Sequence, residues 1–188
     1  MNGGNSMANI YRLDRNDTVL VIVDLQEKLM VAMKHREQVY SNTRLLAAAA
    51  KQMGIPVIVT EQYPRGLGPT VDEVKSGLAE YTCIEKIKFS AFDDMKDVIA
   101  ATNRKTVLMT GSETHVCVFQ TTCDLIEAGY TVHVVKDAVC SRFKNNFKNG
   151  LDLMKGAGAV ITNAETVVFD LMGISGTPEF KAISPLVK

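Results

Sequence analysis

The stretch Lys105–Leu125, KTVLMTGSETHVCVFQTTCDL, determines how the rest of the chain is interpreted. It opens with the branched, apolar run TVLM (106–109), which predicts a short buried strand. Gly111 interrupts this run, and from Thr114 onward apolar residues recur at helical spacing. The sequence therefore predicts a buried strand followed by a helix, with Cys117 in the first turn of that helix.

A cysteine in this position is a candidate nucleophile. The unpaired N–H groups and the positive end of the helix dipole favour a thiolate, so we expect a lowered pKa for Cys117. The same N–H groups could hold an oxyanion that forms on an attacked carbonyl group. The alternative is a cysteine that only packs in the core, which is common for this residue type.

Length and composition indicate a single soluble domain. The chain has 188 residues, 46% of them hydrophobic, and 21 basic residues balance 21 acidic ones. This balance gives no indication of a nucleic-acid partner or a membrane surface, and no apolar run reaches the roughly 20 residues of a membrane span. We expect a flexible leader over residues 1–10, without the features of a signal peptide, and one domain over residues 11–188.

Four cysteines are spread along the chain without a C-x-x-C pair. In a chain of this length, that spacing predicts reduced thiols rather than a disulfide scaffold, and we expect a cytoplasmic protein.

Strand and helix patterns alternate along the whole chain. The alternation predicts a doubly wound α/β fold, a three-layer Rossmann-like sandwich around a six-stranded parallel sheet. The expected strands are residues 18–23, 55–60, 81–86, 106–109, 130–135 and 159–162. The expected helices are residues 37–53, 70–77, 93–102, 114–128, 142–155 and 165–172, and residues 175–188 form a tail that could pack on a neighbour.

Three strand ends carry residues that form a chemically coherent set. Asp24, Lys86 and Cys117 follow or end their strands, and parallel strands place such ends at one edge of the sheet. Cysteine can attack a carbonyl carbon, aspartate can move the proton, and lysine can stabilise both anions. Asp24 could also cap the following helix, and lysine is more often a solvated surface residue.

Other catalytic or ligand-binding arrangements fit less well. His115 is two residues from Cys117, a spacing that turns their side chains apart on a helix, and neither His35 nor His133 is placed as a base. His115, Cys117 and Cys123 do not have the spacing of a zinc site, so no metal is expected.

The turn after the first strand, residues 24–27, contains no glycine, which excludes the dinucleotide-binding fingerprint, and no phosphate-binding loop signature occurs. A peroxide-sensing thiol stays open as an alternative.

Five segments give the chain a resemblance to the isochorismatase-like cysteine hydrolase family. They occur in the family's order and cover most of the chain: VIVDLQ (21–26), IVTEQYPRGLGPTV (58–71), EKIKFSAF (85–92), GSETHVCV (111–118) and VVKDAVCSR (134–142). The second segment is most similar to the isochorismatase domain-containing proteins. It is less similar to the nicotinamidases, which carry metal-binding histidines that this chain lacks.

The resemblance implies an Asp-Lys-Cys triad of Asp24, Lys86 and Cys117. Lys86 is preferred to Lys88 because the family places its lysine in the motif K-x-x-[FY]-S-A-F, which begins at residue 86. The resemblance also implies a cis peptide bond before Glu113, and an oxyanion hole formed by the backbone N–H groups of Glu113 and Cys117.

The implied activity is cofactor-independent hydrolysis of a small amide or related carbonyl compound, through a thioester. A non-catalytic or redox-sensing member of the same fold, with a reactive Cys117, is the alternative. The family resemblance also implies a homo-oligomer, a dimer or larger. From position alone, the expected substrate-binding residues are Gln26, Gln62, Tyr63, Phe89 and Thr114.

Overall fold

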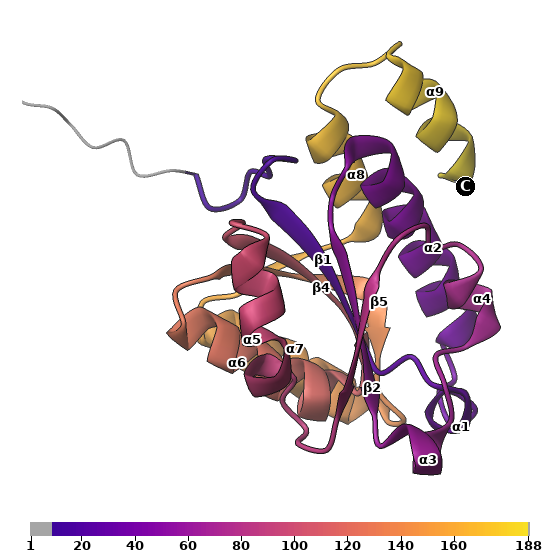
Figure 1. Ribbon diagram of the computed structural model, residues 1–188, viewed down its shortest axis with the longest axis vertical. Helices are drawn as coiled ribbons and strands as arrows, with labels where there is room; N and C mark the ends of the chain where they lie inside the picture. Colours follow the sequence, from indigo (N-terminus) through magenta and orange to yellow (C-terminus); the bar gives the residue numbers. More distant parts are fainter. Residues whose placement is uncertain (1–8, 188) are drawn as a thin grey trace, which may run out of the picture.

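The protein forms a six-stranded parallel sheet with helices on both faces (Figure 1). The computed structural model describes residues 9–187, so the predicted leader over residues 1–10 lies almost entirely outside the described residues. The strand order is β3-β2-β1-β4-β5-β6, and every neighbouring pair is parallel. This order is the doubly wound arrangement that the sequence predicts.

The six strands correspond closely to the predicted runs. They are β1 (Thr18–Val23), β2 (Val57–Gln62), β3 (Thr82–Lys86), β4 (Thr106–Ser112), β5 (Thr131–Cys140) and β6 (Val160–Thr162). The strand order reverses between β1 and β4: from β1 the chain adds β2 and β3 on one side, and from β4 it adds β5 and β6 on the other. Open α/β sheets place their sites at the carboxyl ends of the strands beside such a reversal.

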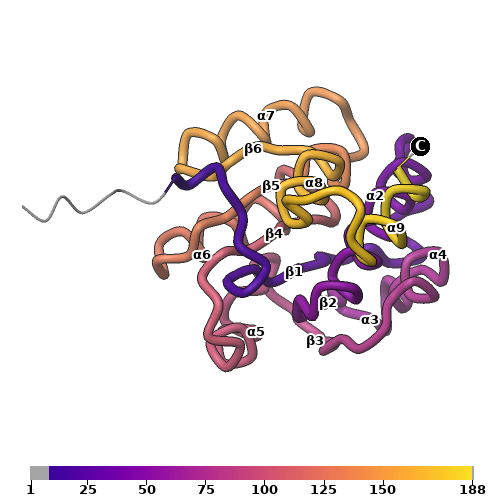
Figure 2. Tube along the Cα trace, turned by 90° about the horizontal axis from the view of Figure 1, so that it is seen from above, coloured from indigo at the N-terminus to yellow at the C-terminus, as the bar shows by residue number. Residues whose placement is uncertain are grey.

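Helices on each face of the sheet complete three layers (Figures 1 and 2). One face carries α5 (Phe92–Ala101), α6 (Phe119–Glu127) and α7 (Lys144–Gly156), and the other carries α2 (Arg36–Met53), α8 (Ala164–Met172) and α9 (Pro178–Ile183). Short helices occupy the loops: α1 (Glu27–Met30), α3 (Pro64–Leu67), α4 (Asp72–Lys75), a π-helical turn over Thr114–Val118 and a 3-10 turn over Ser184–Leu186.

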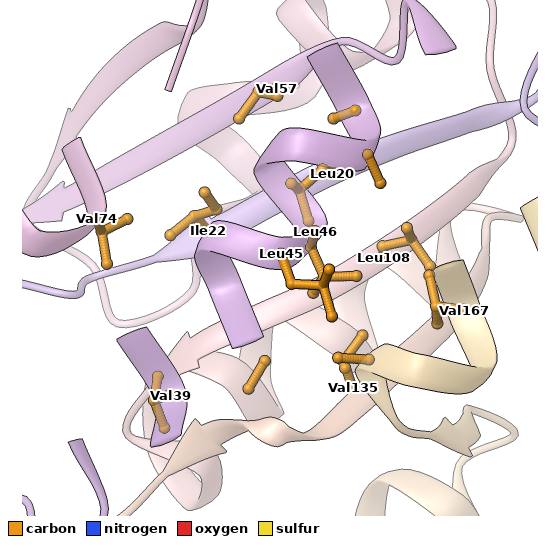
Figure 3. Packing of buried hydrophobic residues seen from close by; sticks show 14 of the residues in the cluster. Leu20, Ile22, Val39, Leu45, Leu46, Val57, Val74, Leu108, Val135 and Val167 are labelled. Atoms are coloured by element: carbon orange, nitrogen blue, oxygen red, sulfur yellow. The ribbon is translucent and has the colours of Figure 1, made fainter. Parts of the chain in front are cut away.

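Strand β1 explains why the core has two halves. All six of its residues are buried, and alternate side chains point to opposite faces of a strand. Val19, Val21 and Val23 pack beneath α5, α6 and α7, whereas Leu20 and Ile22 pack beneath α2 and α8 (Figure 3). Because each fully buried branched side chain contributes about 1.5–3 kcal/mol, β1 is held firmly from both sides.

Several predicted boundaries are corrected by the structure. Strand β2 begins at Val57 and continues to Gln62, so Glu61 and Gln62 belong to the strand rather than to the loop. Strand β5 continues to Cys140, because an irregularity in its pairing with β4 lets the chain resume the ladder after Val134. The predicted tail contains α9, whose buried Ile183 packs in the chain's own core beside α2.

Among residues 9–187, no helix combines the length and the apolar character needed to cross a membrane.

Candidate active site

A buried ion pair lies where β1 and β3 end. Lys86 Nζ lies 2.7 Å from Asp24 Oδ2, and both side chains are 0% exposed. Thr60, from the intervening strand β2, donates a 2.7 Å hydrogen bond to Asp24 Oδ1. The carboxylate therefore has a partner on each oxygen. Burial nevertheless raises the pKa of Asp24, while Lys86 and Thr60 act in the opposite direction.

Lys86 is held by three more acceptors. Its ammonium group donates to Gln62 Oε1 at 2.7 Å, to the Phe89 carbonyl oxygen at 3.0 Å and to the Lys88 carbonyl oxygen at 3.2 Å. The loop after β3 thus folds back over the lysine that precedes it. These contacts offset the cost of burying an ammonium group and fix its position beside Asp24.

Cys117 lies in the π-helical turn Thr114–Val118, after β4, and its thiol is buried. The expectation of a lowered pKa is wrong for this structure: burial, followed by the negative charge of Asp24, raises the pKa of Cys117 to about 12, although Lys86 acts in the opposite direction. Burial of the thiol outweighs the stabilisation that a helix start gives to a thiolate. The thiol is therefore protonated in the free protein, and Asp24 is the adjacent group that could accept its proton.

The end of β4 is packed tightly against β1. Gly111 has φ +126°, and a Cβ atom there would overlap the Val23 carbonyl oxygen, so only glycine fits. Ser112 donates a 2.8 Å hydrogen bond from Oγ to the Asp24 carbonyl oxygen. The peptide bond between Ser112 and Glu113 is cis, as the resemblance implies. The backbone that would donate to an oxyanion is thus anchored directly to the Asp24 segment.

A polar network supports the same backbone from the other side. The Glu113 carboxylate is paired with Arg142 and lies 3.5 Å from His115 Nε2. His115 Nδ1 is 3.0 Å from Ser141 Oγ, and Asn146 lies 3.2 Å from Nε2. The ring of His115 thus contacts these groups rather than the Cys117 thiol.

The five residues expected at the substrate pocket occupy different environments. Gln26 is buried and binds the backbone of Gln62 and Gly68 through its amide, so it fastens the loop after β2 to the end of β1. Tyr63 and Phe89 are exposed on the two neighbouring loops. Thr114 is buried, and among the described residues its Oγ1 has no hydrogen-bond partner.

Sequence reasoning missed Thr60 as a partner of Asp24 and the polar network around Glu113. The position of Thr60 follows from the sheet order, because its strand lies between those of Asp24 and Lys86. The Arg142 contact joins segments far apart in the sequence and left no local signal. Within residues 9–187, no group of three or more histidine, cysteine, aspartate or glutamate side chains is arranged to hold a metal ion.

The fold and the site define the class of protein, a doubly wound α/β sandwich with a buried Asp–Lys ion pair and a cysteine at the carboxyl edge of its parallel sheet. The sequence matches the isochorismatase domain model over residues 18–166, and the chain therefore belongs to the isochorismatase family. It is 40% identical to the secreted isochorismatase effector Isc1 of Phytophthora sojae, covering 94% of this chain and 87% of that protein. It is 34% identical to isochorismatase domain-containing protein 2 of Xenopus laevis, covering 97% and 89%.

Solved structures give the same result. The MAR1 ribonuclease from Caenorhabditis elegans has a TM-score of 0.88 and 40% identity, covering 94% of this chain and 92% of that one. The YcaC gene product from Escherichia coli, described as an octameric hydrolase of unknown specificity, has a TM-score of 0.87 and 28% identity, covering 93% and 88%. The predicted family and fold are confirmed, and family membership supports a hydrolase.

Proposed function

We propose that the protein hydrolyses a small amide, or a related carbonyl compound, without a cofactor and through a thioester on Cys117. The observation that carries the proposal is the fully buried Asp24–Lys86 ion pair, whose carboxylate lies beside the Cys117 thiol. A buried proton acceptor, a fixed cation and a thiol are the groups that acyl transfer needs.

In the proposed first half-reaction, the Cys117 sulfur attacks the carbonyl carbon while its proton moves to Asp24. The oxyanion is held by the backbone N–H groups of Glu113 and Cys117. Asp24 then gives the proton to the leaving nitrogen, which departs as an amine. In the second half-reaction, Asp24 takes a proton from water and the hydroxide attacks the thioester. The C–S bond then breaks, a carboxylic acid leaves, and Asp24 returns the proton to the Cys117 sulfur.

The direction of the Asp24 pKa suits this double role. Burial raises that pKa and favours the protonated carboxyl group, whereas Lys86 favours the ionised form.

For the substrate pocket we propose Gln26, Gln62, Tyr63, Phe89 and Thr114. The exposed Tyr63 and Phe89 supply apolar surface, while Gln26 and Gln62 act chiefly by holding the loop and Lys86.

Two other functions receive less support. A peroxide-sensing thiol needs a lowered pKa, whereas burial and Asp24 raise that of Cys117. The Caenorhabditis elegans relative is named a ribonuclease, but here basic and acidic residues are equal in number, and the candidate nucleophile is buried. A small substrate fits these properties better than a nucleic acid.

We further propose a homo-oligomer and a reducing, cytoplasmic environment. The Escherichia coli relative is described as octameric, and light scattering on purified protein would show the number of subunits. All four cysteines of this chain, which lie within the described residues, are unpaired. The Phytophthora sojae relative is named as secreted, so fractionation of the source cells tests the compartment directly.

The test is a panel of small amides and esters assayed with the wild type, Cys117→Ala and the matched control Cys123→Ala. Cys123 is a half-buried thiol on α6. We expect Cys117→Ala to lose at least about a thousandfold in kcat/KM, and Cys123→Ala to keep normal activity. Rapid quenching and intact mass analysis should detect an acyl group on the wild type and on Cys123→Ala, but not on Cys117→Ala. Full activity in Cys117→Ala would overturn the proposal.

A further inference from the structure

A cavity that no triad residue lines lies between the loop before α2 and the start of α7. It has a volume of about 550 Å³, within the range of small-molecule sites. Its walls come from three segments: residues 34–38, the end of β5 and residues 141–148. None of Asp24, Lys86 and Cys117 lines it.

The lining of this cavity is strongly basic. It contains Lys34, His35, Lys136, Arg142, Lys144 and Lys148 and no acidic side chain. Arg142 is paired with Glu113, but among the described residues none of the four lysines is within ion-pair distance of a carboxylate. In a chain with equal numbers of basic and acidic residues, this concentration of one sign is local. Positive charges gathered in a concave site attract anions.

The remaining lining is apolar. Phe143 is 63% exposed, Phe147 is half-buried, and Val139 forms part of the floor. Inorganic ions need no such wall, whereas an organic anion gains from covering it. Ser141 and Arg142 line the cavity and also bind His115 and Glu113, so the cavity is rigid at this side.

We propose that this cavity is a second ligand site, which binds a small organic anion: a phosphate or carboxylate head on an apolar, preferably aromatic, body. The lysines neutralise the head, and the two phenylalanines cover the body. The site shares no triad residue with the proposed hydrolysis, although Arg142, which lines it, is paired with Glu113.

The experiment is calorimetric titration of the full chain with phenyl phosphate, benzoate and the neutral counterpart phenol. Phenyl phosphate and benzoate should bind, phenol should not, and raising the salt from 50 to 300 mM should weaken binding several-fold. Lys34→Gln/Lys148→Gln should weaken phenyl phosphate binding about tenfold. The control Lys96→Gln/Lys155→Gln removes two exposed charges outside the cavity and should change it less than about twofold.

Two more measurements separate this site from its alternatives. Saturating phenyl phosphate should leave the iodoacetamide labelling rate of Cys117 unchanged, whereas a ligand at the triad would slow the labelling. Phe143→Ala should weaken phenyl phosphate more than inorganic phosphate. Equal losses in both lysine pairs, or tight binding of phenol, would overturn the proposal. So would displacement of phenyl phosphate by an oligouridine at far lower concentration, because that would indicate a nucleic-acid surface.

Discussion

The buried ion pair makes Lys86→Met the most informative single substitution in this fold. The change keeps the length of the side chain and removes its charge. Of the two partners of the Asp24 carboxylate described above, only Thr60 then remains. The side chains of Asp24 and Lys86 are both 0% exposed. Solvent therefore cannot screen the loss.

The expected cost can be estimated from the contacts. Breaking a fully buried pair by removing one partner costs about 3–5 kcal/mol. Lys86 also donates to Gln62 Oε1 and to two carbonyl oxygens, but these acceptors belong to half-buried or exposed residues and add less to the cost, because water can replace the ammonium group. Domains of this size are commonly stable by about 5–15 kcal/mol, so the variant should fold with a much reduced margin.

The loss should depend on pH. Lys86 lowers the pKa of Asp24, so the substitution raises that pKa further above its ordinary value of 3.8. The folded state then binds a proton that the unfolded state has released, and stability falls as the pH rises from about 4 through the folded pKa. We therefore expect a smaller loss at pH 5 than at pH 8.

Urea unfolding followed by circular dichroism at pH 5, 6.5 and 8 measures this effect. Lys88→Met is the matched control, because Lys88 is exposed and pairs with Asp93 at the surface; we expect little change at any pH. Asp24→Asn/Lys86→Met removes both charges and should recover most of the loss at pH 8. A pH-independent loss in Lys86→Met, or an equal loss in Lys88→Met, would refute the reasoning.

Three further predictions concern the surroundings of the site. Gly111→Ala should cost more than about 3 kcal/mol in urea unfolding because its Cβ overlaps β1, whereas Gly158→Ala, with φ +107° but open space, should cost about 1–2 kcal/mol. Asp24→Asn should lower the pKa of Cys117 from about 12 and speed iodoacetamide labelling at pH 8 several-fold. Asp124→Ala loses the hydrogen bond from Ser90 Oγ that fixes the loop after β3, and kcat for the proposed reaction should fall about tenfold.

Each of these predictions has a result that contradicts it. Equal stability of the two glycine variants would show that the overlap with β1 relaxes cheaply. Slower labelling of Cys117 in Asp24→Asn would mean that the carboxylate promotes thiolate formation in the free protein. An Asp124→Ala protein with unchanged kcat would mean that the loop carbonyls hold Lys86 without help from α6.

The fold could be predicted because apolar runs in the local sequence mark its strands. The run from Thr18 to Val23 is apolar on both faces, as a central strand must be, and its position in the sheet follows from alternation with helices. The tail was harder to interpret. Ile183 is buried against α2, but its segment is short, and nothing in its own pattern shows which distant surface it covers.

The site could be predicted as a set of residues but not as an electrostatic environment. Asp24, Lys86 and Cys117 follow from strand ends and a shared edge. The pKa of Cys117 depends on how deeply the thiol is buried and how close the Asp24 carboxylate lies, which the sequence does not encode locally. The start of a helix lowers the pKa of a thiol, but burial and a neighbouring negative charge raise the pKa of Cys117 by more.

The order of the sheet has a consequence for how the protein refolds. Asp24 ends β1, Lys86 ends β3, and Cys117 follows β4, so the three residues meet only after β1 has paired with strands that are distant in the chain. Parallel pairings between distant segments form slowly, since a large loop must close before any contact is gained. The Asp24–Lys86 ion pair needs β1, β2 and β3, whereas the thiol joins the pair only after β4 has paired with β1. Recovery of the native Cys117 labelling rate after dilution from denaturant therefore reports completion of the central sheet, not collapse of the chain.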